Sequence, residues 1–372
     1  MPFGIFKRRG IADRGEQEIM ALYDSVPVVL LTGFLGSGKT TLLNELLADP
    51  AMTDSAVIVN EFGSVPIDHA LVKVGSERYF RTTTGCICCT ATSDVRASLF
   101  ELHEARRLGE IAPFSRVLIE TTGLADPAPI INSLVAGGAP AIGLRDHVVG
   151  RHFHLSKVFT TLDALDGREM LDRHVEGWKQ LAFADHVVAT KTDLAGPAFS
   201  DLQWLNPAAR FHDRHDPDFR PAEIILEAGR YSTLGKTDDV VGWLAMEGLS
   251  RHRVHDHDPN RHGDGIKAVA LTQEQPLDPY KLQMFLDLIV SNIQSGLLRL
   301  KGIVALADDP SRPAIVHAVQ HRLYPIQRLD AWPGEPRATK LVLIGHELRS
   351  QQIQELFAYL VSTSKARKRR VI

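Results

Sequence analysis

Two glycines followed by lysine and threonine are the first residues in this chain whose spacing suggests chemistry. In the segment GFLGSGKTT, four residues separate Gly33 from Gly38, and Lys39 and Thr40 follow directly. This pattern is typical of a phosphate-binding loop, in which glycines allow backbone N–H groups to surround phosphate oxygens. Lys39 is then placed to reach the β- and γ-phosphates, and the Thr40 hydroxyl to ligate Mg²⁺.

The flanking residues supply the elements that such a loop needs. Val28–Thr32 is an apolar run without polar alternation, which predicts a buried parallel strand. The residues after the loop, TLLNELLADP, have helical spacing and end at Pro50. A helix N-terminus adds partial positive charge to the phosphate site. We expect the following residues to bind nucleotide: Gly33, Gly36, Ser37, Gly38, Lys39, Thr40 and Thr41.

A second motif, TKTD, suggests which base is bound. It follows the predicted strand Val187–Ala189, and ligands of open α/β sheets bind at the carboxyl ends of strands. The Asp193 carboxylate can accept hydrogen bonds from guanine N1–H and its 2-amino group, which adenine lacks. The Lys191 stem can pack on the base, and we include Thr190 in this site. The sequence therefore predicts GTP rather than ATP.

A third stretch, RVLIETTGLADP, contains a predicted strand, Val117–Ile119, that ends in Glu120. In phosphate-loop enzymes an acidic residue at this place holds Mg²⁺, usually through water. Gly123 is placed for its N–H to contact the γ-phosphate. The alternative for Glu120 is a strand-ending carboxylate that caps the next helix.

All three cysteines of the chain, Cys86, Cys88 and Cys89, lie within four positions. Adjacent Cys88 and Cys89 would form a strained disulfide, so metal binding is the better interpretation. Thiolates are suitable ligands for Zn²⁺, and three sulfurs leave a fourth position open, as suits a carrier that must release its ion. The alternative is three buried cysteines that act as small apolar residues.

Composition narrows the class of protein. With 372 residues, 44% hydrophobic and 23% charged, the chain has the balance of a globular protein of two or three domains. A net charge of −3 argues against nucleic-acid binding. The chain has no apolar run of the length that spans a membrane and no signal-peptide pattern, so we expect no membrane association and a cytoplasmic location.

Together these segments resemble the CobW-type metallochaperone GTPases, which are relatives of the urease and hydrogenase nickel-insertion GTPases. The resemblance covers residues 27–362 and rests on LLTGFLGSGKTTLLNELL, IVNEFGSVPIDHALV, TTGCICC, VLIETTGLADPAPI and TKTD, in this order. It implies GTP hydrolysis coupled to handling of a transition metal, mostly Zn²⁺ and sometimes cobalt. It also implies delivery of the ion to a client apo-metalloenzyme.

One segment departs from the pattern. Many members of the family carry acidic residues on both sides of the Asn-Glu-Phe-Gly run, but here these positions are Val59 and Ser64. This departure weakens the case for an additional carboxylate-containing metal site and does not affect the thiolate site. Of the local carboxylates that remain, Glu61 and Asp68, we assign Asp68 to the organisation of Mg²⁺ or of the attacking water. The predicted catalytic residues are Lys39, Asp68 and Glu120.

The fold expected is a doubly wound α/β phosphate-loop GTPase domain followed by a smaller α+β domain. The predicted boundaries are an N-terminal extension 1–25, a GTPase domain 26–235, a His-rich linker 236–264, an α+β domain 265–362 and a basic tail 363–372. In the linker, His252, His255 and His257 form a weak candidate site for Zn²⁺ or Ni²⁺, the alternative being a solvated hinge. His152 and His154 are expected on a surface loop.

The predicted cofactors and ligands are GTP, Mg²⁺ and Zn²⁺, with Co²⁺ or Ni²⁺ in place of Zn²⁺ as alternatives. The predicted partner is a client apo-metalloenzyme, and the sequence leaves a homodimer open. Two other functions fit a phosphate loop with a thiolate cluster. One is a metal-storage or scaffold protein with incidental nucleotide turnover, and the other is a small-molecule kinase. The Asp193 segment and the lack of a recognisable acceptor site argue against the kinase.

Overall fold

A computed structural model of the chain describes residues 25–59, 79–81, 91–135, 143–196, 202–203, 205–206, 209–227, 266–292, 296–332 and 337–362. The predicted linker and basic tail, and the predicted N-terminal extension apart from Ser25, lie outside these residues. Within the described part, none of the helices has the length and apolar character needed to cross a membrane. The predicted domain boundaries remain predictions.

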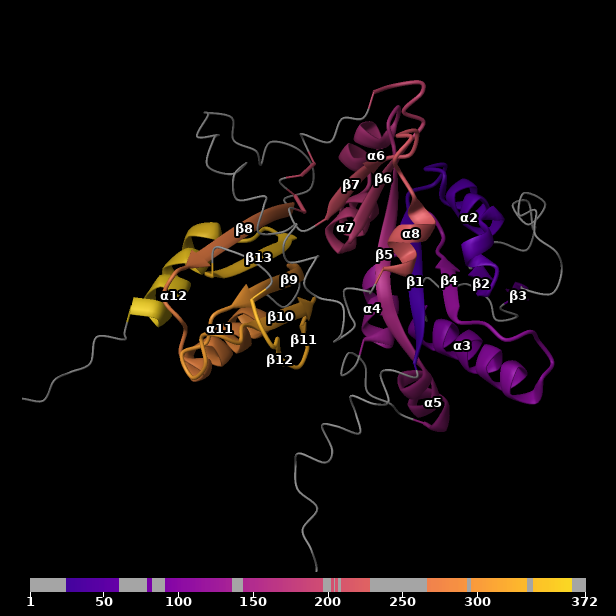
Figure 1. Ribbon diagram of the computed structural model, residues 1–372. Coiled ribbons are helices and arrows are strands. Elements are labelled where there is room, and N and C mark those ends of the chain that lie inside the picture. Colours follow the sequence, from indigo (N-terminus) through magenta and orange to yellow (C-terminus); the bar gives the residue numbers. More distant parts are fainter. Residues whose placement is uncertain are drawn as a thin grey trace, which may run out of the picture.

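The first domain is built on a parallel sheet with the strand order β3-β2-β4-β1-β5-β6-β7 (Figure 1). Every neighbouring pair in this sheet is parallel, so all strands end at one edge. The strands are β1 (Val26–Gly33), β2 (Ser55–Val59), β3 (Tyr79–Arg81), β4 (Arg116–Glu120), β5 (Phe153–Asp163), β6 (His186–Thr190) and β7 (Arg210–Asp213). The central strand β1 is almost entirely buried, as its apolar run predicts.

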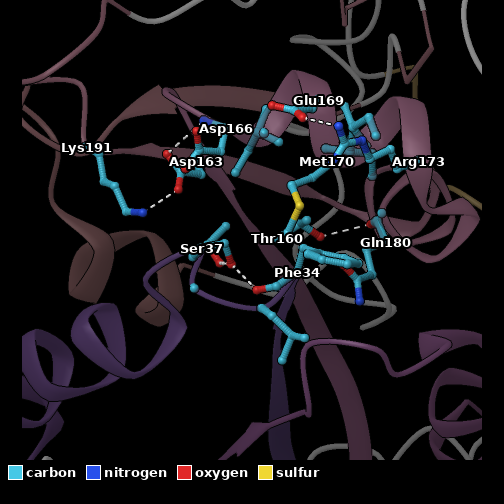
Figure 2. A pocket seen from close by; sticks show the side chains of 18 residues that line it. Phe34, Ser37, Thr160, Asp163, Asp166, Glu169, Met170, Arg173, Gln180 and Lys191 are labelled. Atoms are coloured by element: carbon cyan, nitrogen blue, oxygen red, sulfur yellow. Dashed lines mark hydrogen bonds and ion pairs between the residues drawn. The ribbon is translucent and has the colours of Figure 1, made fainter.

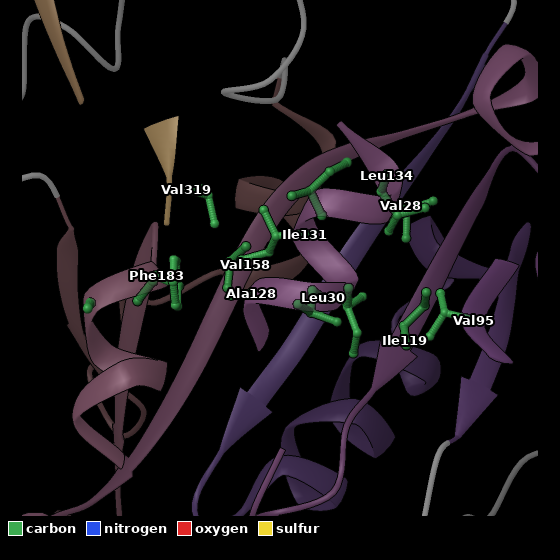
Figure 3. Close-up of a cluster of buried hydrophobic side chains, with 14 of the residues drawn as sticks. Val28, Leu30, Val95, Ile119, Ala128, Ile131, Leu134, Val158, Phe183 and Val319 are labelled. Carbon is green, nitrogen blue, oxygen red and sulfur yellow. The ribbon is translucent and has the colours of Figure 1, made fainter. Parts of the chain in front are cut away.

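Helices cover both faces of this sheet, which confirms the doubly wound architecture. Alternate β1 side chains enter different cores: Leu30 packs with the face covered by α3, α4, α5 and α7, and Leu31 with the face covered by α2 and α8. Figure 3 shows the first core, where Ile131 of α4 lies over the strands. The helices of this domain are α2 (Lys39–Ala48), the 3-10 turn η1 (Pro50–Met52), α3 (Ala91–Leu108), α4 (Pro127–Leu134), α5 (Leu144–His152), α6 (Gly167–Arg173), α7 (Val175–Phe183) and α8 (Pro221–Leu226).

The second domain is an antiparallel sheet with the order β11-β10-β9-β13-β8, and β12 pairs with β10. Its elements are β8 (Ile266–Gln273), α11 (Pro279–Asn292), β9 (Leu297–Val304), β10 (Ala314–Val319), β11 (Arg322–Leu323), β12 (Gln327–Arg328), β13 (Thr339–His346) and α12 (Ser350–Ser362). Helices α11 and α12 pack on one face, where Phe285 and Phe357 meet edge to face with ring centroids 5.2 Å apart. This arrangement confirms the smaller α+β domain.

The alternation along β13 shows how the two domains join. Leu341 and Leu343 point into the core under α11 and α12, whereas Val342 and Ile344 belong to the core of the first domain. Residues from β9 and β10 join them there, and Val319 of β10 appears beside α4 and α7 in Figure 3. One continuous apolar core therefore runs from the first sheet to the second.

Polar contacts fix the same junction. Arg299 of β9 is 2% exposed, and its guanidinium donates to the Asp185 carboxylate at 2.8 Å. It also donates to the carbonyl oxygens of Ala182 (3.2 Å) and Ala184 (2.9 Å), at the end of α7. Burial, and then the charge of Arg299, holds the pKa of nearby His317 well below its usual value. Because its guanidinium binds the last carbonyl oxygens of α7, Arg299 also places a positive charge at the C-terminal end of that helix.

Two local expectations were wrong. His152 ends α5 and His154 lies in β5, where its Nδ1 is 2.7 Å from the Ser25 hydroxyl. The apolar residues Phe153 and Leu155 alternate with the histidines, and this alternation extends β5 beyond the loop that we expected. Strand β9 begins at Leu297, and its residues before Gly302 already pair with β10 and β13.

Candidate functional site

The phosphate-loop residues lie between the end of β1 and the start of α2, as the motif predicts. Gly33 has φ 141°, and a Cβ there would lie 2.6 Å from the Thr161 carbonyl oxygen, so only glycine fits. Gly38 has φ 88° and precedes the first helical residue, Lys39. The chain therefore curves tightly into α2, and the N–H groups of the first turn face the space that a phosphate would occupy.

Neighbouring strand ends hold this loop in place. The Ser37 hydroxyl donates to the Phe34 carbonyl oxygen at 2.7 Å and lies 2.6 Å from the Thr161 hydroxyl. The Thr190 hydroxyl at the end of β6 donates to the Ser37 carbonyl oxygen at 2.8 Å. These contacts tie the phosphate loop to the ends of β5 and β6.

Lys39 lies across the mouth of the loop. Its side chain is 7% exposed, and Nζ donates to the Phe34 carbonyl oxygen at 2.8 Å. This bond places the ammonium group over the loop, where it can exchange the carbonyl for phosphate oxygens. The predicted ligand Thr41 is exposed in the same first turn.

Thr40 and Glu120 meet where a divalent ion would be needed. The Thr40 hydroxyl donates to Glu120 Oε1 at 2.7 Å, although the two residues are 80 positions apart. Glu120 is 5% exposed at the end of β4. A carboxylate and a hydroxyl are the hard oxygen ligands that Mg²⁺ prefers, so the two side chains fit this ion.

Gly123 follows Glu120 and packs directly on the phosphate loop. A Cβ on Gly123 would lie 2.5 Å from the Leu35 backbone nitrogen. On the other side, the side-chain amide of Gln180 in α7 donates to the Gly123 and Ala125 carbonyl oxygens, each at 3.1 Å. Sequence reasoning missed Gln180, because nothing in the segment WKQLAF indicates that its glutamine contacts the loop at Gly123.

The TKTD residues lie beside the phosphate loop at the next strand end. Lys191 has φ 54°, and its ammonium group pairs with Asp163 at the end of β5. Asp193 is about half exposed, with Oδ1 3.7 Å from His215 Nε2. Asp163 and His215 were not predicted. The polar end of an otherwise buried strand was the signal for Asp163, whereas nothing local indicated His215.

A cavity of about 280 Å³ lies beside the outer side of the phosphate loop (Figure 2). Phe34 and Ser37 form one wall, and α6 and α7 form the other, where Gln180 lies. Because it touches both the loop and Lys191, the cavity opens next to the predicted nucleotide site.

Several predicted site residues lie outside the described residues: Asp68, Cys86, Cys88, Cys89, His252, His255 and His257. The cysteine segment follows Arg81, the last residue of β3, and precedes Ala91, the first residue of α3. Since the sheet is parallel, β3 ends at the same edge as Gly33 and Glu120. Among the described residues no group of three or more His, Cys, Asp or Glu side chains could hold a metal ion.

Comparison with protein families gives two matches along the chain. Residues 27–214 match the family model "CobW/HypB/UreG, nucleotide-binding domain". Residues 266–361 match "Cobalamin synthesis protein cobW C-terminal domain". Together the two matches span both domains of the structure.

Characterised proteins similar to this chain carry related names. It is 29% identical to the zinc chaperone YjiA of Escherichia coli, over 90% of this chain and 98% of that protein. It is 26% identical to the zinc-regulated GTPase metalloprotein activator 1 of Dictyostelium discoideum, over 77% of this chain and 64% of that protein. The crystal structure of Zn(II)-bound YjiA GTPase from E. coli has the same fold, with a TM-score of 0.66 at 22% identity, covering 90% of this chain and 99% of that one.

Proposed function

The chain belongs to the CobW/HypB/UreG family of nucleotide-binding proteins, and on this basis we propose that it is a Mg²⁺-dependent GTPase that carries a transition metal to a client metalloprotein. We assign Zn²⁺ as the ion and Cys86, Cys88 and Cys89 as its ligands. Two of the similar proteins are named a zinc chaperone and a zinc-regulated GTPase metalloprotein activator, which supports this choice.

One observation carries the GTPase part of the proposal. Lys39, the Thr40–Glu120 pair and Gly123 lie together at one edge of a parallel sheet, although they come from separate parts of the chain. Each offers what phosphoryl transfer from a nucleotide needs: a cation, oxygen ligands and a backbone N–H group. Since little covalent chemistry falls to the protein, positioning and charge stabilisation account for most of the rate.

The roles in hydrolysis follow from these positions. Lys39 leaves the Phe34 carbonyl oxygen and binds the β- and γ-phosphates, where it stabilises the negative charge of the transition state. Thr40 and Glu120 would hold Mg²⁺, and the ion would supply positive charge against the negative charge that develops on the phosphate oxygens. The Gly123 N–H group contacts the γ-phosphate and loses that contact on hydrolysis. Asp68 orients the attacking water.

Base selection is assigned to Asp193. Its carboxylate accepts from guanine N1–H and the 2-amino group, and the Lys191 stem packs on the ring. Adenine lacks both donors, so the carboxylate would stay unpaired on binding ATP.

The position of the cysteine segment supports a link between metal and nucleotide. The segment follows β3, which ends at the sheet edge where Gly33 and Glu120 lie. Movement of that edge on hydrolysis can therefore act on the thiolate ligands. Three thiolates leave a fourth position of Zn²⁺ open, and this opening gives a client a place to bind the ion.

Calorimetry with GTP and ATP tests the proposal. We expect GTP to bind at least about ten times more tightly, a difference of about 1.4 kcal/mol. Asp193→Ala should remove most of this difference, whereas the control Asp172→Ala, at an exposed position of α6, should leave it unchanged. Equal affinity of the parent chain for both nucleotides would contradict the assignment. Single-turnover hydrolysis by the same preparation separates a GTPase from a scaffold with incidental turnover.

A further inference from the structure

Two consecutive residues of α7 hold the loop that contains Gly123. Gln180 Nε2 donates to the Gly123 and Ala125 carbonyl oxygens, each at 3.1 Å. Lys179 Nζ donates to the Asp126 carboxylate at 3.0 Å, and both of these side chains are 29% exposed. We refer to Lys179 and Gln180 as the α7 latch. The loop is therefore held at Gly123, Ala125 and Asp126, the last of which directly precedes α4.

The other side of the same loop is fixed by β1 and the phosphate loop. The Thr121 N–H donates to the Leu31 carbonyl oxygen at 2.9 Å. Gly123 packs against the backbone of Leu35. Between these contacts and the latch, the loop makes a turn in which the Ala125 N–H donates to the Thr122 carbonyl oxygen at 3.2 Å. The position of Gly123 thus depends on α7 as much as on β4.

Gln180 is well placed to hold the loop rigidly. Gln180 is 1% exposed, and its backbone carbonyl oxygen accepts a hydrogen bond from the Thr160 hydroxyl at 2.9 Å. The Gly123 and Ala125 carbonyl oxygens fix the orientation of the Gln180 side-chain amide. If this amide were reversed, its own oxygen would face those two oxygens. A buried amide is costly without hydrogen bonds, so this glutamine is not an incidental member of an apolar face.

We propose that the α7 latch sets the discrimination between GTP and GDP by holding Gly123 where its N–H meets the γ-phosphate. The inference rests on the proposed GTPase function and makes Gln180 a positioning residue. A loop fixed in advance pays no ordering cost when the triphosphate binds. GDP has no γ-phosphate and does not use the loop. Loosening the latch therefore weakens GTP binding selectively.

The test compares Gln180→Leu with Asn206→Leu in the full chain. Leucine at 180 removes both hydrogen bonds to the loop. Asn206 is also buried, and its side chain donates to the carbonyl oxygens of Leu181, Ala182 and Ala184 on the same helix. None of these hydrogen bonds reaches the loop 121–126, so Asn206→Leu controls for a general loss of stability.

The first readout is the ratio of the GDP dissociation constant to that of a non-hydrolysable GTP analogue. We expect Gln180→Leu to lower this ratio about tenfold, which corresponds to about 1.4 kcal/mol. Gln180→Leu should keep the parent affinity for GDP. The control Asn206→Leu should keep the parent ratio. If Gln180→Leu does not fold, Lys179→Met removes the exposed part of the latch and should lower the ratio about threefold.

The second readout is hydrogen exchange in the nucleotide-free chain. Amides of residues 121–126 should exchange faster in Gln180→Leu but not in Asn206→Leu. If the parent distinguishes GTP from GDP while Gln180→Leu and Lys179→Met keep the same ratio, the latch is refuted and the proposed function stands. If the parent binds neither nucleotide, the proposed function fails, and so does the role of the latch in nucleotide discrimination. The hydrogen-exchange data then show by themselves whether α7 holds the loop.

Discussion

Replacing Arg299 by methionine removes the cation that joins the two domains while keeping most of the apolar stem. Arg299 is 2% exposed and its partner Asp185 is fully buried, with N and O 2.8 Å apart. After the substitution the Asp185 carboxylate remains inside the protein and still accepts from the Val158 N–H at 3.0 Å. It loses the positive charge of Arg299, with which it forms a buried ion pair.

The expected cost follows from which groups lose a partner. The Ala182 and Ala184 carbonyl oxygens keep their bonds from Asn206, so these acceptors contribute little. The buried carboxylate dominates, because removing one member of a buried ion pair costs about 3–5 kcal/mol. A domain is stable by about 5–15 kcal/mol, so this substitution removes a large share of the free energy of unfolding.

Urea unfolding followed by tryptophan fluorescence measures this loss. The double variant Arg299→Met with Asp185→Asn should lose less than Arg299→Met alone, because the uncompensated charge is gone. Arg312→Met provides the control, since Arg312 pairs with Asp330 at the surface and an exposed pair contributes less than about 1 kcal/mol. If Arg299→Met costs no more than Arg312→Met, the junction does not depend on this ion pair.

Three further predictions concern other parts of the chain. Lys39→Ala should lower GTP hydrolysis about 100-fold or more without unfolding the chain, and a folded variant with the parent rate would refute its role. Burial lowers the pKa values of the stacked His103 and His152, and it lowers that of His317 further, so the folded state binds fewer protons than the unfolded state and stability should fall as pH drops below about 6.5. His103→Gln should remove part of this dependence in urea melts at pH 7.5 and 5.5, and an unchanged slope would contradict the contribution of His103. Gly302→Ala should destabilise the second domain by about 1–3 kcal/mol because its Cβ would collide with the Lys340 carbonyl oxygen, whereas Gly143→Ala, with open space around it, should not.

The sequence predicted the fold well where the signal is local. The apolar run before Gly33 and the helical spacing after it give β1 and α2 to within two residues at each end. The parallel sheet also explains why Glu120 and Thr40 come together. A polar residue that follows a buried parallel strand lies at the carboxyl edge of the sheet, where ligands bind.

Contacts between distant segments could not be predicted in this way. Arg299 and Asp185 are 114 positions apart, and neither has a neighbouring pattern that identifies the other. Gln180 resembles any polar residue in an amphipathic helix until the loop at Gly123 is placed beside it. His154 was assigned to a surface loop because the histidines concealed the apolar alternation of β5. In each case the partner comes from tertiary packing rather than from the sequence nearby.

A competitive Zn²⁺ titration with a chelating dye tests the central claim, that metal binding is coupled to nucleotide state. The parent chain is titrated once with GDP and once with a non-hydrolysable GTP analogue. Since coupling between two ligands is reciprocal and typically amounts to about 1–3 kcal/mol, the two Zn²⁺ affinities should differ by roughly 5- to 150-fold. Changing Cys86, Cys88 and Cys89 together to serine should abolish the tight site in both states. Superimposable curves for the parent chain with the two nucleotides would contradict the metallochaperone mechanism.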